Sequence, residues 1–349
     1  MKRSHGMGDA VMSETYNLYG AVASPFSMKM RAYLRYRRIP FRWISGIEAN
    51  EIARTKVPHY MVPVLGRPDG TYANDSTPLI NELEATFDER RTDPEDPGDA
   101  FLAYLIEDFA DEWLVNAMFH YRWHGEANQL EASRLILFEG MRGGDGLESI
   151  DQMATFWAQR QLKRIPIYAG GEGSFAIVDQ TAQELFAIME AALVHGIYLF
   201  GTRPSRAEFA LYGQFSQIVE YRYPSDILRR DFPFLVRWTA LMNDQSGLEG
   251  SWAPLSTRRE SPTYTAVEKL MGLIGKTHLP FLEANERAYA AGDETFSFDI
   301  DGARYTRAAT ERNTGCLGPL KDRYAALATD EKLVLEPLLG PTGCLDFLT

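Results

Sequence analysis

A Ser-Pro-Phe-Ser sequence at residues 24–27 lies between a strand-like segment at residues 16–20 and a basic amphipathic helical pattern at residues 26–37. A strand, a proline-containing turn and a helix N-terminus form the layout of a thiol-handling active site, since the start of a helix stabilises a thiolate. The chain's cysteines, however, are at positions 316 and 344. The motif therefore offers hydroxyl groups but no sulfur of its own.

The missing sulfur separates two kinds of chemistry. Disulfide exchange needs an attacking thiolate, so a glutaredoxin-like reductase is disfavoured when serine stands at both 24 and 27. A serine hydroxyl can instead donate a hydrogen bond to the sulfur of a bound thiol, whose pKa in solution is about 8.5. Considered alone, Ser24 is better explained as a helix cap, a common role of serine.

The elements around this motif follow from the hydrophobic pattern and the turn signals. Alternating residues predict strands, and Pro68-Asp69-Gly70 predicts a turn between two of them. The expected order is β-α-β-α-β-β-α, with strands at residues 16–20, 40–46, 62–65 and 71–73 and helices at residues 26–37, at residues 48–56 and from Ser76 onward. This is a small mixed sheet with helices.

A charged, Pro/Gly-rich segment at residues 91–100 reads as a linker, and strand signals stop after it. The helices expected there cover residues 101–124, 128–140, 149–165, 174–195, 205–220 and 231–243. An α/β part followed by an all-α part predicts two domains, at residues 16–90 and 101–250. Residues 251–349 form an extension with a helical stretch broken near Pro280, a hairpin around Asp301-Gly302 and two short helices, at residues 311–327 and 330–339.

Composition limits the classes of partner. The net charge of −12 disfavours nucleic-acid and anionic-membrane binding, because phosphate contacts need a basic surface. No apolar run approaches the roughly 20 residues of a membrane helix, and residues 1–15 read as a disordered tail. Two cysteines do not complete a zinc shell, so no metal is expected, and they favour a reducing cytoplasm.

Three motifs in this order resemble those of the cytosolic glutathione transferase superfamily, in its serine-type, bacterial-like form. They are Ser24-Pro25-Phe26-Ser27 after the first strand, Val62-Pro63-Val64-Leu65, and Asn74-Asp75-Ser76-Thr77 at a helix start. The resemblance covers roughly residues 16–245 and implies an α+β multidomain fold. That fold is a thioredoxin-like domain, with a mixed four-stranded sheet and helices, followed by an all-α helical bundle.

The resemblance implies glutathione as co-substrate and Ser24 as the residue that holds its thiolate. Ser27 is the near alternative, and Tyr19 is a weaker one because some classes use a tyrosine at the end of the first strand. Phe26 and Ser27 are also implied as glutathione contacts. An S-x-x-E capping box at Ser205 and Glu208 resembles a helix start that the superfamily uses for folding.

The other two motifs are implied to hold the tripeptide. A cis bond between Val62 and Pro63 would leave the Val62 backbone free to pair with the cysteinyl part, whereas the alternative is a trans proline at a sheet edge. Asp75 would meet the γ-glutamyl ammonium, and Ser76 the carboxylate. The alternative for both is a simple helix cap.

The family also needs a cation for the glycyl carboxylate. Many serine-type members place a lysine immediately before the valine of the Val-Pro pair, but this chain has Met61 there. The candidates for a substitute cation are His59 and Lys56 in the preceding segment, and Arg37 and Arg42.

The resemblance places a hydrophobic electrophile between the domains, against residues 107–126. Trp113, Asn116 and His120 share one helical face, which Tyr121 and His124 extend, and Phe26 and Tyr221 are weaker candidates for the pocket. Core packing explains most of these residues better than a pocket does. The family further implies a homodimer. The competing function is a non-catalytic binding or scaffold protein that kept the fold.

Overall fold

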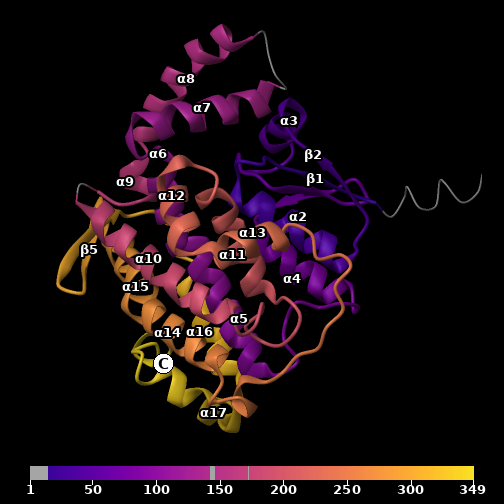
Figure 1. The fold of residues 1–349 in the computed structure, drawn as a ribbon, viewed down its shortest axis with the longest axis vertical. Coiled ribbons are helices and arrows are strands. Elements are labelled where there is room, and N and C mark those ends of the chain that lie inside the picture. The colour runs from indigo at the N-terminus through magenta and orange to yellow at the C-terminus, as the bar shows by residue number, and fades with distance from the viewer. Residues whose placement is uncertain (1–14, 142–145, 172) are drawn as a thin grey trace, which may run out of the picture.

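The N-terminal part of the protein is a four-stranded mixed sheet with strand order β2-β1-β3-β4 (Figure 1). The structure is a computed structural model that describes residues 15–141, 146–171 and 173–349, so the tail predicted at residues 1–15 lies outside the described residues except for residue 15. The central strand β1 pairs parallel to β2 and antiparallel to β3, which pairs antiparallel to β4. The elements are β1 (Tyr16–Tyr19), α2 (Pro25–Arg37), β2 (Phe41–Ile44), α3 (Ile47–Thr55), β3 (Val64–Gly66), β4 (Tyr72–Asn74) and α4 (Ser76–Thr86).

This order is the predicted β-α-β-α-β-β-α succession, and it confirms the thioredoxin-like fold. Both faces of the sheet are covered: Leu18 and Leu65 are buried in the main hydrophobic core, and Tyr19 and Val64 are buried in a smaller cluster. The sheet brings the C-terminal end of β1, the start of β3 and the end of β4 together. These are the three places where the sequence motifs lie.

A helical part follows, as predicted, but it begins earlier than expected. The first helix starts at Pro97, inside the segment predicted as a linker, because Asp96 accepts a hydrogen bond from the Asp99 amide at 3.0 Å and Pro97 suits a first helical turn. The elements are α5 (Pro97–Phe109), a π-helical turn η1 (Ala110–Leu114), α6 (Val115–Trp123), α7 (Gly125–Met141), α8 (Leu147–Leu162), α9 (Ile165–Tyr168), α10 (Ser174–Leu193), α11 (Arg206–Ile218), α12 (Arg222–Asp231) and α13 (Pro233–Met242).

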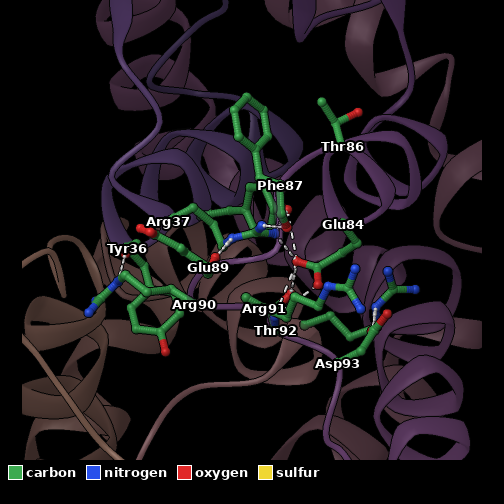
Figure 2. Close-up of polar contacts among 12 residues, drawn as sticks. Tyr36, Arg37, Glu84, Thr86, Phe87, Glu89, Arg90, Arg91, Thr92 and Asp93 are labelled. Carbon is green, nitrogen blue, oxygen red and sulfur yellow. Dashed lines mark hydrogen bonds and ion pairs between the residues drawn. The ribbon is translucent and has the colours of Figure 1, made fainter.

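The remainder of the predicted linker is bound to the N-terminal part by a buried polar cluster (Figure 2). Glu84 forms an ion pair with Arg37 and accepts three hydrogen bonds from Thr92, two from its amide at 3.1 Å and one from its hydroxyl at 2.9 Å. Arg37 also donates to the carbonyl of Phe87 at 2.6 Å. The segment therefore holds the two parts of the chain together and does not act as a loose tether.

The two parts pack closely along α2 and α11. At Gly213 in α11, an added Cβ atom would lie 2.6 Å from the carbonyl oxygen of Pro25. Only glycine allows this approach of two helix backbones. The predicted capping box at the start of α11 is confirmed, since Glu208 accepts from the Ser205 amide at 2.8 Å and Ser205 accepts from the Ala207 amide at 3.2 Å.

The extension folds as predicted in outline. It comprises η2 (Leu255–Thr257), α14 (Pro262–Lys276), α15 (His278–Ala291), β5 (Thr295–Ile300), β6 (Ala303–Ala308), η3 (Glu311–Asn313), α16 (Leu317–Ala326), α17 (Thr329–Leu339) and α18 (Leu345–Leu348). The hairpin turn is confirmed, with φ of 51° at Asp301 and 80° at Gly302. The predicted break near Pro280 is confirmed and lies at Thr277, three residues before the proline, because proline is tolerated in the first turn of a helix, where α15 places it.

The extension shares one hydrophobic core with the helical part. Figure 1 shows α14 of the extension beside α10. The ring of Trp113 in η1 packs against Phe281, Phe298 and Tyr305, at centroid distances of 5.7, 6.2 and 5.2 Å. The buried carboxylate of Asp99 accepts a hydrogen bond from the Leu255 amide at 3.1 Å. In the described part of the chain, no helix combines the length and apolar character needed to cross a membrane.

Candidate active site

The hydroxyl of Ser24 stands at the N-terminus of α2, as the motif predicts. Its oxygen accepts a hydrogen bond from the Ser27 amide at 3.3 Å, so Ser24 does cap the helix. Accepting this bond uses a lone pair and leaves the hydroxyl proton free to be donated. The side chain is partly exposed. Capping and donation to a ligand are therefore compatible roles for the same residue.

The two alternatives to Ser24 are less accessible. Ser27 is fully buried, and its hydroxyl oxygen accepts a hydrogen bond from the Ala21 amide at 3.3 Å. Tyr19 is also buried, with its ring 6.2 Å from that of Tyr72, and burial raises the pKa of its phenol. The geometry therefore favours Ser24 and puts Ser27 beneath the surface where the sequence expected a ligand contact.

The peptide bond between Val62 and Pro63 is cis, which confirms the predicted geometry. Val62 is partly exposed and precedes β3, and its backbone makes no hydrogen bond to the described residues. A backbone N–H and C=O in this position can pair with an extended peptide in the manner of an added strand.

Asp75 lies at the start of α4 in an unusual backbone conformation, with φ of 77°. Its side chain is exposed and makes no capping hydrogen bond, so simple capping does not explain it. A non-glycine residue in this region is strained, and such strain is concentrated at functional sites. The carboxylate is thereby left available for a cation.

Ser76 is buried and is held from below by Lys29 of α2, whose ammonium donates to the Ser76 hydroxyl at 3.3 Å. Because the lysine supplies the proton, the Ser76 hydroxyl keeps its own proton for another acceptor. The Lys29 ammonium lies 2.6 Å from Glu107 and 2.6 Å from Asp111, both buried on the helical part.

These buried charges compensate one another. Burial lowers the pKa of Lys29, but Asp111 and Glu107 outweigh it, so the pKa is raised and the lysine stays charged. Burial raises the pKa of Asp111, against the opposing influence of Lys29. Arg206 adds a second buried cation, 3.1 Å from Glu107. The network joins the start of α4 to α5 and α11 beneath the candidate site.

The structure narrows the set of candidate cations. The prediction that Arg37 could bind the glycyl carboxylate is wrong, because this side chain is buried and contacts Glu84 and two backbone carbonyls. Lys56, His59 and Arg42 are all exposed. The carbonyl of His59 accepts from Asn74 at 3.0 Å, which brings His59 to the end of β4 beside Asp75.

The sequence missed one cation, Arg312 of the extension. Its guanidinium lies 5.3 Å from the centre of the Phe26 ring and 3.5 Å from Glu112, and Glu112 and Asp75 both raise its pKa. Its neighbour Asn313 anchors it, donating to Glu112 at 2.6 Å and accepting from Arg307 at 3.2 Å. No local sequence pattern marks Arg312, since only tertiary packing brings the extension to the start of α2.

The face predicted for the electrophile is filled by protein. Trp113 and Asn116 are buried against the extension, with the Asn116 oxygen accepting from Tyr305 at 3.0 Å and Arg307 at 3.1 Å. His120 is buried, which lowers its pKa to about 4. Tyr121 donates to Asp179, His124 stacks on Phe175, and Tyr221 is buried. Core packing accounts for these residues, and of the predicted pocket only Phe26 lies at the site.

The loop before Ser24 is held by the helical part. Glu139 of α7 accepts from the Val22 amide at 2.6 Å and from the Ala23 amide at 3.4 Å. Gln217 donates to the Val22 carbonyl at 2.9 Å, and Arg122 to the Ala23 carbonyl at 2.8 Å.

Among the described residues, no group of His, Cys, Asp and Glu side chains could hold a metal ion.

Residues 18–91 match the family model described as the N-terminal domain of glutathione S-transferase. This match spans all three motifs and ends one residue before Thr92. A search of curated protein sequences found no match.

Solved structures with a similar fold include a glutathione S-transferase from Methylobacterium radiotolerans in complex with glutathione sulfonate, with 21% identity over 68% of this chain and 96% of that chain and a TM-score of 0.42. The beta-etherase LigF from Sphingobium has 17% identity over 66% of this chain and 94% of its own, with a TM-score of 0.46. FzlA from C. crescentus has 17% identity over 73% and 92%, with a TM-score of 0.40.

Proposed function

We propose, from the match of residues 18–91 to the family model described as the N-terminal domain of glutathione S-transferase, that the chain binds glutathione and activates its thiol for attack on an electrophilic small molecule. The observation that carries the proposal is the placement of three groups on neighbouring elements. These are the Ser24 hydroxyl at the start of α2, the free Val62 backbone before β3, and the uncapped Asp75 carboxylate at the start of α4.

Ser24 supplies the activation in this proposal. Its hydroxyl donates to the glutathione sulfur, and the positive end of α2 favours the negative charge, so the thiol loses its proton to solvent at a lower pH. The thiolate then attacks an electrophilic carbon, a carbon–sulfur bond forms, and the leaving group departs with its electron pair. Ser24 itself stays protonated and forms no covalent bond.

The other groups orient the tripeptide. Val62 pairs with the cysteinyl backbone, Asp75 meets the γ-glutamyl ammonium, and Ser76 donates to the γ-glutamyl carboxylate. Phe26 forms an apolar wall next to Ser24, while His59 is the nearest exposed candidate for the glycyl carboxylate. Such positioning converts a bimolecular reaction into an effectively unimolecular one, which accounts for a large part of enzymatic rate enhancement.

Glutathione thiolate absorbance tests the proposal directly. Addition of glutathione to the wild-type chain should produce an ultraviolet thiolate signal that titrates below the pKa of free glutathione. Ser24→Ala should remove the signal, whereas Ser27→Ala, at the buried neighbouring hydroxyl, should retain most of it. The assignment would be refuted by absence of the signal in the wild type or by an unchanged signal in Ser24→Ala.

A second candidate function is a non-catalytic binding or scaffold protein. It is favoured by one observation, namely that the extension buries the face of Trp113 and Asn116 where an electrophile was expected. Retention on immobilised glutathione without turnover of a general aromatic electrophile would indicate this function. Turnover that depends on Ser24 would indicate the transferase.

We further propose that the chain forms a homodimer in the cytoplasm. Its proposed parts are a thioredoxin-like domain at residues 16–90, a helical domain at residues 101–250 and an extension at residues 251–349. An apolar surface supports self-association, because large side chains on α7 and α8 are exposed, including Phe138 (58%) and Phe156 (71%). Light scattering of the purified chain measures its mass. The double variant Phe138→Glu/Phe156→Glu should shift a dimer to a monomer if these helices form the interface.

A further inference from the structure

A cavity outside the candidate active site lies between α2, α11, the end of α12 and α13, and it is open to solvent. Its volume is about 680 Å³. Its size is within the range of small-molecule binding sites. The family motifs do not include its residues, except that Met28 and Arg31 share a helix with Ser24.

Three guanidinium groups from three different helices line this cavity, and no carboxylate does. They belong to Arg31, Arg229 and Arg237, and none of them forms an ion pair with the described residues. Arg237 also lacks any hydrogen bond to those residues, and Arg229 donates only to Ser225, at 3.1 Å. Such a concentration of unpaired positive charge is notable in a chain with a net charge of −12.

Arg31 is the fixed member of the set. Its guanidinium stacks 5.0 Å from the Trp43 ring and donates to the Asn243 oxygen at 3.1 Å, while its buried Nε atom has no partner. The same Asn243 oxygen accepts from Arg35 at 3.2 Å. The Asn243 oxygen is neutral, so these hydrogen bonds leave both guanidinium groups with their positive charge.

No carboxylate lines the cavity, although several lie near it. Glu139, which faces Arg31, accepts from two backbone amides of the loop before Ser24. Asp231 pairs with Arg230 on the far side of α12, at 2.6 Å. Asp244, next to Arg35, accepts from the Ser246 amide at 2.9 Å. Arg229 and Arg237 are exposed to solvent, so an anion can reach the three guanidinium groups, and no carboxylate in the lining would repel it.

We propose that this cavity binds a small phosphate monoester with an apolar body, at a site separate from the glutathione site. Planar guanidinium forks match phosphate oxygens with paired hydrogen bonds, and three of them suit a doubly charged group. The hydroxyls of Tyr212 and Ser216 donate within the protein, to Asn243 at 3.0 Å and to the Gly213 carbonyl at 2.7 Å, so the guanidinium groups would supply the hydrogen bonds to the phosphate. Met28, Val219, Val236 and Ala240 supply the apolar wall for the rest of the ligand.

Phenyl phosphate is the probe, measured by calorimetric titration of the full-length chain. The double variant Arg229→Ala/Arg237→Ala should weaken binding by at least about tenfold, since each charge-assisted pair lost costs about this factor. The control Arg222→Ala/Arg230→Ala removes the same charge from exposed positions of α12 outside the cavity, and should change affinity by less than about twofold. Ala240→Glu, which adds a carboxylate to the wall, should also abolish binding.

Three results would overturn the proposal. They are no binding of phenyl phosphate to the wild type, equal losses in the two double variants, or inorganic phosphate binding as tightly as phenyl phosphate. Ser24→Ala should bind the probe like the wild type, and saturating glutathione should not displace it. This site therefore stands or falls independently of the transferase assignment.

Discussion

The buried lysine beneath the candidate site permits a stringent test of the electrostatic interpretation. Lys29→Met removes an ammonium that lies 2.6 Å from each of two buried carboxylates. Glu107 keeps a second cation, Arg206, at 3.1 Å, but Asp111 loses its main partner. Breaking a buried pair by removing one member costs about 3–5 kcal/mol, so the free energy of unfolding should fall by that amount.

The same chain provides a matched control. Lys276 also contacts two carboxylates, Glu184 at 2.8 Å and Asp301 at 2.9 Å, but its side chain is 30% exposed and its partners are 39% and 49% exposed. Water screens these pairs, so Lys276→Met should cost less than about 1 kcal/mol. Both variants remove one positive charge and keep a long apolar side chain. The difference between them therefore reports burial.

Urea denaturation followed by circular dichroism is the assay, and a double-mutant cycle with Asp111→Asn isolates the pair. The coupling energy between Lys29 and Asp111 should exceed about 2 kcal/mol. Since burial already raises the pKa of Asp111, the lysine variant should lose less stability in mildly acidic buffer, where this carboxyl takes up a proton. Equal losses in Lys29→Met and Lys276→Met would refute the reasoning.

Three further predictions concern other parts of the molecule. Burial raises the pKa of Asp99 to about 7, so between about pH 4 and pH 7 the folded state holds a proton that the unfolded state has lost. The free energy of unfolding should therefore fall as pH rises through this range, by about 1.4 kcal/mol per pH unit at most. Asp99→Asn should flatten this part of the plot of unfolding free energy against pH, measured by denaturation at a series of pH values. Arg312→Ala should weaken glutathione binding about threefold to tenfold, because the acidic groups around Arg312 would then repel the anionic tripeptide. The control is Arg304→Ala, which removes an arginine from an exposed ion pair with Asp299 and should leave the affinity for glutathione, measured by titration, unchanged. Gly213→Ala should cost about 1–3 kcal/mol in urea denaturation because its Cβ would meet the Pro25 carbonyl, whereas Gly140→Ala, with open space around it, should be neutral or slightly stabilising.

The N-terminal fold was predictable because its signals are local. Strand alternation, the Pro68-Asp69-Gly70 turn and the capping serines each act within a few residues, and the structure keeps all of them. The same holds for the Asp301-Gly302 hairpin. One error concerns Pro97, which lies in the first turn of a helix where the sequence predicted a linker. The break predicted near Pro280 is present, but it lies at Thr277 because Pro280 falls within the first turn of α15.

The candidate site was predictable only for the residues carried by the three motifs. The cis geometry at Val62 and the placement of Ser24 follow from segments near one another in the sheet. Arg312 and the filling of the Trp113 face depend on where the extension packs, which no local pattern specifies. Arg37 shows the opposite kind of error. Its residue type and its place on a predicted helix suggested a free cation, but its guanidinium forms a buried ion pair with Glu84.

The contacts of Glu139, Gln217 and Arg122 with the loop before Ser24 have a consequence for motion. A rotation that separates the sheet from the helices has to break these hydrogen bonds together with the close packing of α2 on α11. Under the proposed function, these hydrogen bonds therefore oppose widening of the site when a ligand enters or a product leaves. Substitutions at Glu139, more than a hundred residues from Ser24 in the sequence, would then change turnover through release rates while leaving the reacting groups intact.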